Sequence, residues 1–198
     1  MKSISRRTTL IATGALAVGT VAAATLWRKP APVVHIIPAE GGEHVLLQPF
    51  SVFQPTTPAV APPDIALQDA DGAAHHLGEF AGKGLLINMW ATWCVPCVAE
   101  MPALQSLARK AAAAGILVLP LSSDRGGLAV VRKFYASHGI DGLPIWLDPK
   151  GEAARAWGAR GLPTTFIIDR KGLERGKLEG AIDWAADATL KAITALVG

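Results

Sequence analysis

The sequence predicts an α/β fold in which helices cover both faces of a mixed central sheet. Two near-continuous apolar runs, at residues 85–90 and 116–121, are typical of strands buried on both faces. Each run is followed by apolar residues at helical spacing, within 98–111 and 128–138. Strands that alternate with helices in this way predict a layered sheet.

The other elements supply the antiparallel part of this sheet. Residues 65–68 and 73–77 flank an Asp-Gly turn and are expected to form a hairpin. Further along the chain we expect an extended segment at 143–147, a short helix at 152–157, a strand at 164–169 that turns into 173–178, and a final helix with Ile182, Ala186, Leu190, Ile193 and Val197 on its apolar face.

Residues 1–27 have the pattern of a signal peptide or membrane anchor. A basic cluster at 2–7 precedes a charge-free run from 8 to 27, which would form about 30 Å of helix, enough to cross a bilayer. The alanines at 22–24 offer a cleavage site, whereas the basic pair at 28–29 suits a retained anchor, so both fates stay open. Residues 5–10 also resemble a twin-arginine export signal. Either fate predicts that the rest lies in the periplasm or at the extracytoplasmic face of the inner membrane.

Residues 28–57 are expected to form a proline-rich linker, because eight of the 14 prolines fall between 28 and 63. The folded domain is predicted to span 58–198. Whether residues 33–37 and 45–47 form short strands is left open.

The charge pattern argues against a nucleic-acid partner. The net charge is +3, but Lys2, Arg6 and Arg7 lie in the terminal segment, and the remaining basic residues balance the 16 acidic ones. No basic face for nucleic acid is therefore expected.

The two cysteines, Cys94 and Cys97, form a Cys-x-x-Cys pair between a buried strand and a helix. A cysteine at a helix N-terminus has its thiolate stabilised by unpaired N–H groups, so Cys94 is expected to attack disulfides and Cys97 to resolve the mixed disulfide. The alternatives are a structural disulfide or half of a zinc site that borrows His75 and His76.

Two motifs resemble the TlpA/ResA branch of the thioredoxin superfamily. They are NMWATWCVPCVAEMP at 88–102 and GLPTTFIID at 161–169. The resemblance covers the chain from Pro58 to the C-terminus. It implies an exported thiol-disulfide oxidoreductase with a thioredoxin fold, to which an N-terminal hairpin and a central insertion around 141–157 are added.

The resemblance also implies roles for single residues. Pro163 matches a cis-proline loop that faces the dithiol, where the backbone of Leu162 pairs with a substrate strand. Trp93 is expected beside Cys94 on the substrate-binding surface, together with Pro96 of the motif. Pro102 matches a kink proline of the active-site helix, and Trp90 is expected in the core.

Glu100 lies three residues after Cys97, on the same side of the predicted helix. One interpretation is a solvated carboxylate that suits the helix dipole. The other is a partly buried acid that exchanges protons with the thiols. Thioredoxin has a buried aspartate where this chain has Asn88, so Glu100 is the candidate for that proton transfer.

The favoured function is an exported disulfide reductase that acts on protein cysteine pairs and needs no cofactor or metal. The family resemblance implies a transmembrane thiol electron donor of the CcdA or DsbD type, and apocytochromes c or copper-site cysteines as clients. A disulfide-forming oxidase is the enzymatic alternative. A copper-delivery module is the other, although no histidine follows His138.

Overall fold

The computed structural model describes residues 35–39, 42–46 and 52–198. The segment predicted as a signal or anchor, residues 1–27, lies outside them, so that prediction stays open. Within the described part of the chain, no helix combines the length and the hydropathy needed to cross a bilayer.

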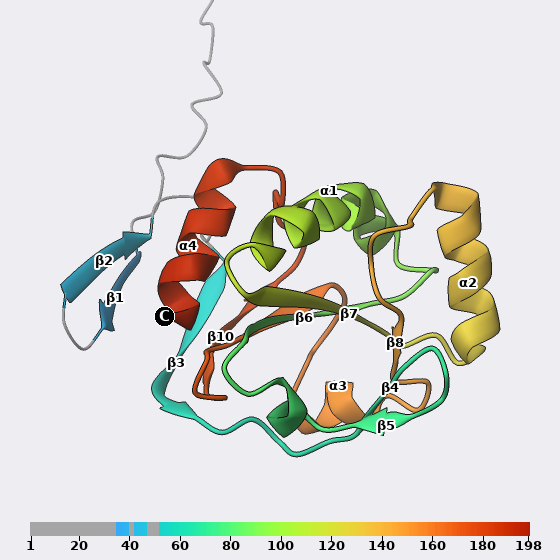
Figure 1. Ribbon diagram of the computed structural model, residues 1–198, viewed down its shortest axis with the longest axis horizontal. Helices are drawn as coiled ribbons and strands as arrows, with labels where there is room; N and C mark the ends of the chain where they lie inside the picture. The colour runs from blue at the N-terminus through green and yellow to red at the C-terminus, as the bar shows by residue number, and fades with distance from the viewer. Residues whose placement is uncertain (1–34, 40–41, 47–51) are drawn as a thin grey trace, which may run out of the picture. The chain divides into compact units, whose positions relative to one another are not determined.

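An eight-stranded mixed sheet forms the centre of the fold (Figure 1). Its strands lie in the order β3-β10-β9-β6-β7-β8-β4-β5. β6, β7 and β8 are parallel, and the other neighbours pair antiparallel. The strands are β3 (Phe53–Val60), β4 (Leu67–Gln68), β5 (Ala74–His75), β6 (Gly84–Trp90), β7 (Ile116–Ser122), β8 (Trp146–Leu147), β9 (Thr164–Ile168) and β10 (Glu174–Glu179).

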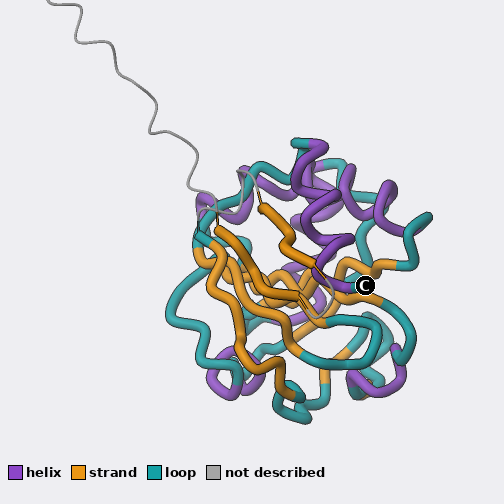
Figure 2. Tube along the Cα trace, turned by 90° about the vertical axis from the view of Figure 1, so that its left-hand side faces the viewer, coloured by secondary structure: helices purple, strands orange, loops and turns teal. Residues whose placement is uncertain are grey.

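Helices lie on both faces of the sheet, as Figure 2 shows from the side. They are α1 (Val95–Ala112), α2 (Gly127–His138), α3 (Glu152–Ala156) and α4 (Asp187–Val197), with a 3-10 turn, η1 (Leu77–Phe80). One hydrophobic core contains residues of α1, α2 and α4, and a second contains α3 and residues packed from η1. The predicted α/β architecture is therefore confirmed.

The central strand β6 separates these two cores. All seven of its residues are buried. Leu86 and Trp90 belong to the core with α1, whereas Leu85, Ile87 and Met89 belong to the other, because successive side chains of a strand point to opposite faces. This alternation explains the continuous apolar run in the sequence, and it directs Asn88 toward the α1 side.

The predicted hairpin forms as β4 and β5. Asp69 closes its turn, because Oδ1 accepts hydrogen bonds from the N–H groups of Asp71 and Ala73. The ring nitrogens of His75 lie 3.0 Å from Asp69 Oδ2 and 2.8 Å from Glu79 Oε2. Both carboxylates raise the pKa of His75. Its ring packs edge-on against Trp146 of β8, so it joins the hairpin to that strand.

The structure differs from the sequence-based boundaries in two places. β3 begins at Phe53 and pairs with β10, so residues 53–57 belong to the sheet, although they were expected in the linker. The last helix begins at Asp187, so Ile182 and Ala186 precede it; Ile182 is buried in the loop before the helix. The strands left open in the sequence exist as β1 (His35–Ala39) and β2 (Gly42–Leu46), which pair antiparallel with each other.

Candidate active site

The two cysteines lie where β6 passes into α1, and they form a disulfide. Cys94 is the N-cap of α1, and its Sγ lies 3.4 Å from the backbone N of Cys97, whose N–H donates to it. The same N–H and the positive end of the helix would stabilise a Cys94 thiolate in the reduced protein. Pro96 fits in the first turn, where a missing N–H breaks no helical hydrogen bond.

The two sulfur-bearing residues differ in access to solvent. Cys97 is fully buried, whereas Cys94 keeps 6% of its surface exposed. The neighbours of Cys94 are much more open, with Trp93 69% and Val95 80% exposed. Exposed apolar side chains on both sides of Cys94 form a surface suited to docking a protein. That Trp93 and Pro96 bind substrate stays a prediction. Trp90, in contrast, is fully buried, as predicted.

The proline loop reaches this site through the pairing of the strands. β6 and β9 run antiparallel with Met89 opposite Thr164, so the loop that precedes β9 lies beside the loop that follows β6. The Leu162–Pro163 peptide bond in that loop is cis, as the resemblance implied. Leu162 packs against the core that contains both cysteines. That Leu162 and Pro163 contact the substrate stays a prediction.

Glu100 is buried behind the dithiol, with 6% of its surface exposed. Its Oε1 accepts a hydrogen bond from Asn88 Nδ2 at 3.0 Å, and its Oε2 accepts the Ile182 N–H at 3.2 Å. Burial raises the pKa of Glu100, and these hydrogen bonds oppose the rise. The buried Trp184 indole also lowers it without making a hydrogen bond of good geometry. Glu100 is therefore not the solvated carboxylate of the first interpretation.

Asp124 is a site residue that the sequence analysis missed. It is buried, and its carboxylate accepts hydrogen bonds from the Thr92 N–H at 2.9 Å, the Thr92 hydroxyl at 2.7 Å and the Ser122 hydroxyl at 2.9 Å. These bonds hold the loop that leads into Cys94. An acid just after β7, at the edge where the parallel strands end, is the signal that could have revealed it.

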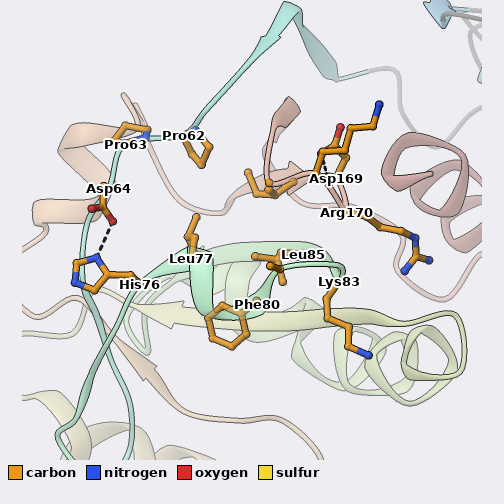
Figure 3. Close-up of a pocket in the computed structure, with 15 residues that line it drawn as sticks. Pro62, Pro63, Asp64, His76, Leu77, Phe80, Lys83, Leu85, Asp169 and Arg170 are labelled. Atoms are coloured by element: carbon orange, nitrogen blue, oxygen red, sulfur yellow. Dashed lines mark hydrogen bonds and ion pairs between the residues drawn. The ribbon is translucent and has the colours of Figure 1, made fainter.

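A cavity of about 480 Å³ opens at the other end of β6. Figure 3 shows its apolar floor, which includes Leu77 and Leu85, and shows the Lys83 and Arg170 side chains extending away from Leu77. The Arg170 guanidinium donates to the carbonyls of Gly82, Ala114 and Gly198. These bonds connect the C-terminal residue with the loops that precede β6 and β7. Because the cavity lies at the end of β6 opposite Cys94, it is separate from the dithiol.

Residues 59–174 match the family model described as "AhpC/TSA family". The thiol-disulfide oxidoreductase ResA of Geobacillus thermodenitrificans (strain NG80-2) is 35% identical over 120 residues, which cover 61% of this chain and 68% of that protein. ResA of Bacillus subtilis (strain 168) is 31% identical over 110 residues, 56% of this chain and 60% of that protein.

The chain belongs to the AhpC/TSA family. Together with its ResA relatives and its Cys94–Cys97 pair, this makes it a ResA-like thiol-disulfide oxidoreductase.

Solved structures agree with this assignment. A Chlorobium tepidum structure described as a thiol:disulfide interchange protein DsbE aligns with a TM-score of 0.63 and 29% identity, covering 71% of this chain and 97% of that chain. The exposed lipoprotein thioredoxin Etrx1 of Streptococcus pneumoniae (strain TIGR4) aligns with a TM-score of 0.58 and 27% identity, covering 67% and 99%. The ResA-like chain therefore has a thioredoxin-like fold.

In the ResA-like oxidoreductase no group of three His, Cys, Asp or Glu side chains gathers as metal ligands within the described residues. His75 is bonded to Asp69 and Glu79, and His76 Nδ1 lies 2.6 Å from Asp64 Oδ1. The histidines of the hairpin are thus engaged with carboxylates of their own region.

Proposed function

We propose that this ResA-like oxidoreductase works outside the cytoplasm as a reductase of disulfides in other proteins. The Cys94 thiolate attacks a substrate disulfide, and one substrate sulfur leaves as a thiolate. Cys97 then attacks Cys94 in the mixed disulfide, which forms the Cys94–Cys97 disulfide and releases the second substrate sulfur. The substrate gains two electrons, and the dithiol loses them.

The buried carboxyl of Glu100 is the main support for reduction, rather than formation, of substrate disulfides. Glu100 lies on α1 one turn after Cys97, and both are buried. A carboxylate near the dithiol offsets part of the stabilisation that the helix N-terminus gives the Cys94 thiolate, because like charges repel. Destabilising the thiolate destabilises the reduced form, so the pair becomes a better electron donor. The ionised Glu100 can also accept the proton that Cys97 must lose before it attacks.

The proposed partners follow from the compartment. A reductase outside the cytoplasm must itself be reduced again, and the resemblance favours a transmembrane thiol donor of the CcdA or DsbD type. Clients would be apocytochromes c or proteins with copper-site cysteines. Residues 8–27 would hold the protein at the membrane if they are not cleaved.

We expect the reduction potential of the Cys94–Cys97 couple to lie near the thioredoxin value of about −270 mV. Equilibration of the protein with glutathione mixtures, followed by counting of free thiols, measures it. A potential close to about −120 mV, that of a strong oxidant, would contradict the reductase direction and support the disulfide-forming alternative. Tight stoichiometric binding of copper(I) by a reduced protein without turnover would instead support copper delivery.

A further inference from the structure

Asn88 is fully buried and holds a polar network behind the dithiol. Its Nδ2 donates to Glu100 Oε1 and to Thr165 Oγ1, each at 3.0 Å. Thr165 lies directly opposite Asn88 in the pairing of β6 with β9. The other amide atom, Oδ1, is buried and has no hydrogen-bond partner among the described residues. A buried amide oxygen left without a donor is costly and calls for an explanation.

Every group that bonds to the carboxyl of Glu100 is a donor. Oε1 faces the amide N–H of Asn88 and Oε2 faces the backbone N–H of Ile182. This arrangement suits an ionised carboxylate, which only accepts hydrogen bonds. A protonated Glu100 must donate its new O–H, and none of these groups accepts it.

A half-turn of the Asn88 amide gives the protonated carboxyl an acceptor, while Nδ2 moves to the position where Oδ1 has no partner among the described residues. The rotation places Oδ1 where Nδ2 was, so that the unpartnered oxygen accepts the O–H of Glu100. The Thr165 hydroxyl adapts as well, because a hydroxyl that accepts from Nδ2 can rotate and donate to Oδ1. One amide and one hydroxyl therefore supply partners for both charge states of the carboxyl.

We propose that Asn88 is a positioning residue for the resolving step, and that its side-chain amide rotates by half a turn whenever Glu100 gains or loses a proton. The proposal rests on the proposed role of Glu100 as proton acceptor. In that step the Cys97 thiol gives its proton to the Glu100 carboxylate, and the Cys97 thiolate attacks the sulfur of Cys94. The substrate sulfur leaves as a thiolate, and the carboxylic acid returns its proton to that thiolate or to water.

In the part of the chain that the structure describes, the groups that face Glu100 come from three segments besides α1 and are uncharged. They are Asn88 on β6, Thr165 on β9 through that amide, and Ile182 with Trp184 in the loop before α4. On α1 itself the titratable neighbours are the cysteines. Since no ion pair with Glu100 competes within the described segments, a change in the charge of its carboxyl acts mainly on the dipole of the Asn88 amide, which can reverse.

Nuclear magnetic resonance on the oxidised wild-type protein tests the rotation of the Asn88 amide directly. The ¹³C shift of the Glu100 carboxyl follows its titration, and contacts of the Asn88 side-chain amide protons with Thr165 report the orientation of the amide. We expect the carboxyl shift and the loss of these contacts to share one midpoint. An amide that keeps its contacts with Thr165 while Glu100 titrates would overturn the proposal.

Two variants extend the test to kinetics. In Glu100→Gln the side-chain N–H₂ takes the place of the acidic O–H, so the Asn88 amide should stay reversed at every pH. Asn88→Leu removes both bonds that the amide can make with Glu100: the N–H donated to the ionised carboxylate and the acceptor for the O–H of the neutral acid. The bond to the carboxylate is the stronger of the two, so its loss raises the pKa of Glu100. The rise of the resolving rate with pH should therefore shift upward by about one pH unit. Tyr135→Phe removes a buried hydroxyl that bonds to the Pro144 carbonyl elsewhere in the same core, and its profile should match the wild type.

The outcomes separate this inference from the proposal on which it rests. A wild-type pH profile in Glu100→Gln would overturn the role of Glu100 and this inference together. A Glu100→Gln variant with the altered profile, beside an Asn88→Leu profile that superimposes on the wild type, would overturn only the role of Asn88.

Discussion

Cys94→Ser should abolish disulfide reduction, with a rate loss of about 10³-fold or more, because the serine hydroxyl is not ionised near neutral pH and cannot form a disulfide. Insulin-disulfide reduction measures the loss. Cys94 is buried at the start of α1 with an N–H directed at its sulfur, whereas Cys97 is farther from solvent. Replacing Cys94 and replacing Cys97 should therefore block different steps of the reaction.

Cys97→Ala provides the matched comparison. It should also lose turnover, yet it should retain the attack by Cys94 and accumulate mixed disulfides with its substrates. Mass spectrometry of these adducts from exporting cells would identify the clients. Adducts that form through Cys97 in a Cys94→Ser protein, and none through Cys94, would reverse the assignment of the two roles.

Glu100→Gln should slow the resolving step about a hundredfold at neutral pH, a typical contribution of a general base. Glu100 accepts a proton only when ionised, and burial raises its pKa above the usual value of 4.5. The wild-type rate should therefore rise with pH through that raised pKa. The variant should lack this limb and depend on the ionisation of Cys97 alone. Stopped-flow reduction of a small disulfide across pH measures both profiles.

The stability of Glu100→Gln supplies the control. A carboxyl whose folded pKa is raised contributes stability that is complete below its unfolded pKa and is lost as the pH rises through the folded value. Ionised Glu100 therefore costs stability at neutral pH, and a neutral glutamine should not lower the melting temperature there. A slow variant with a much lower melting temperature would point to damaged packing rather than to lost proton transfer.

Periodicity and motif spacing predicted much of this fold. The apolar run of β6 and the helical spacing of α1 reflect burial, which determines residue type directly. The edge strand β3 was missed because its prolines at 55 and 58 look like a linker, although an edge position tolerates them. The start of α4 was misplaced because Ile182 is apolar for another reason: it is buried in the loop whose N–H reaches Glu100.

The candidate site was predicted in part. Cys94, Cys97 and Glu100 were recognisable because their chemistry depends on short spacing along one helix. The contacts of Asn88 with Thr165, and of Asp124 with Thr92, join residues 77 and 32 positions apart. Such contacts depend on the register between β6 and β9 and on where the parallel strands β6 and β7 end. Patterns read along a single sequence do not give either.

The most direct test of the account is the pH dependence of the alkylation of reduced protein by iodoacetamide, followed residue by residue. We expect Cys94 to react first, with a pKa below the ordinary thiol value of about 8.5, while Cys97 stays protected. Two equally slow thiols of ordinary acidity would contradict it.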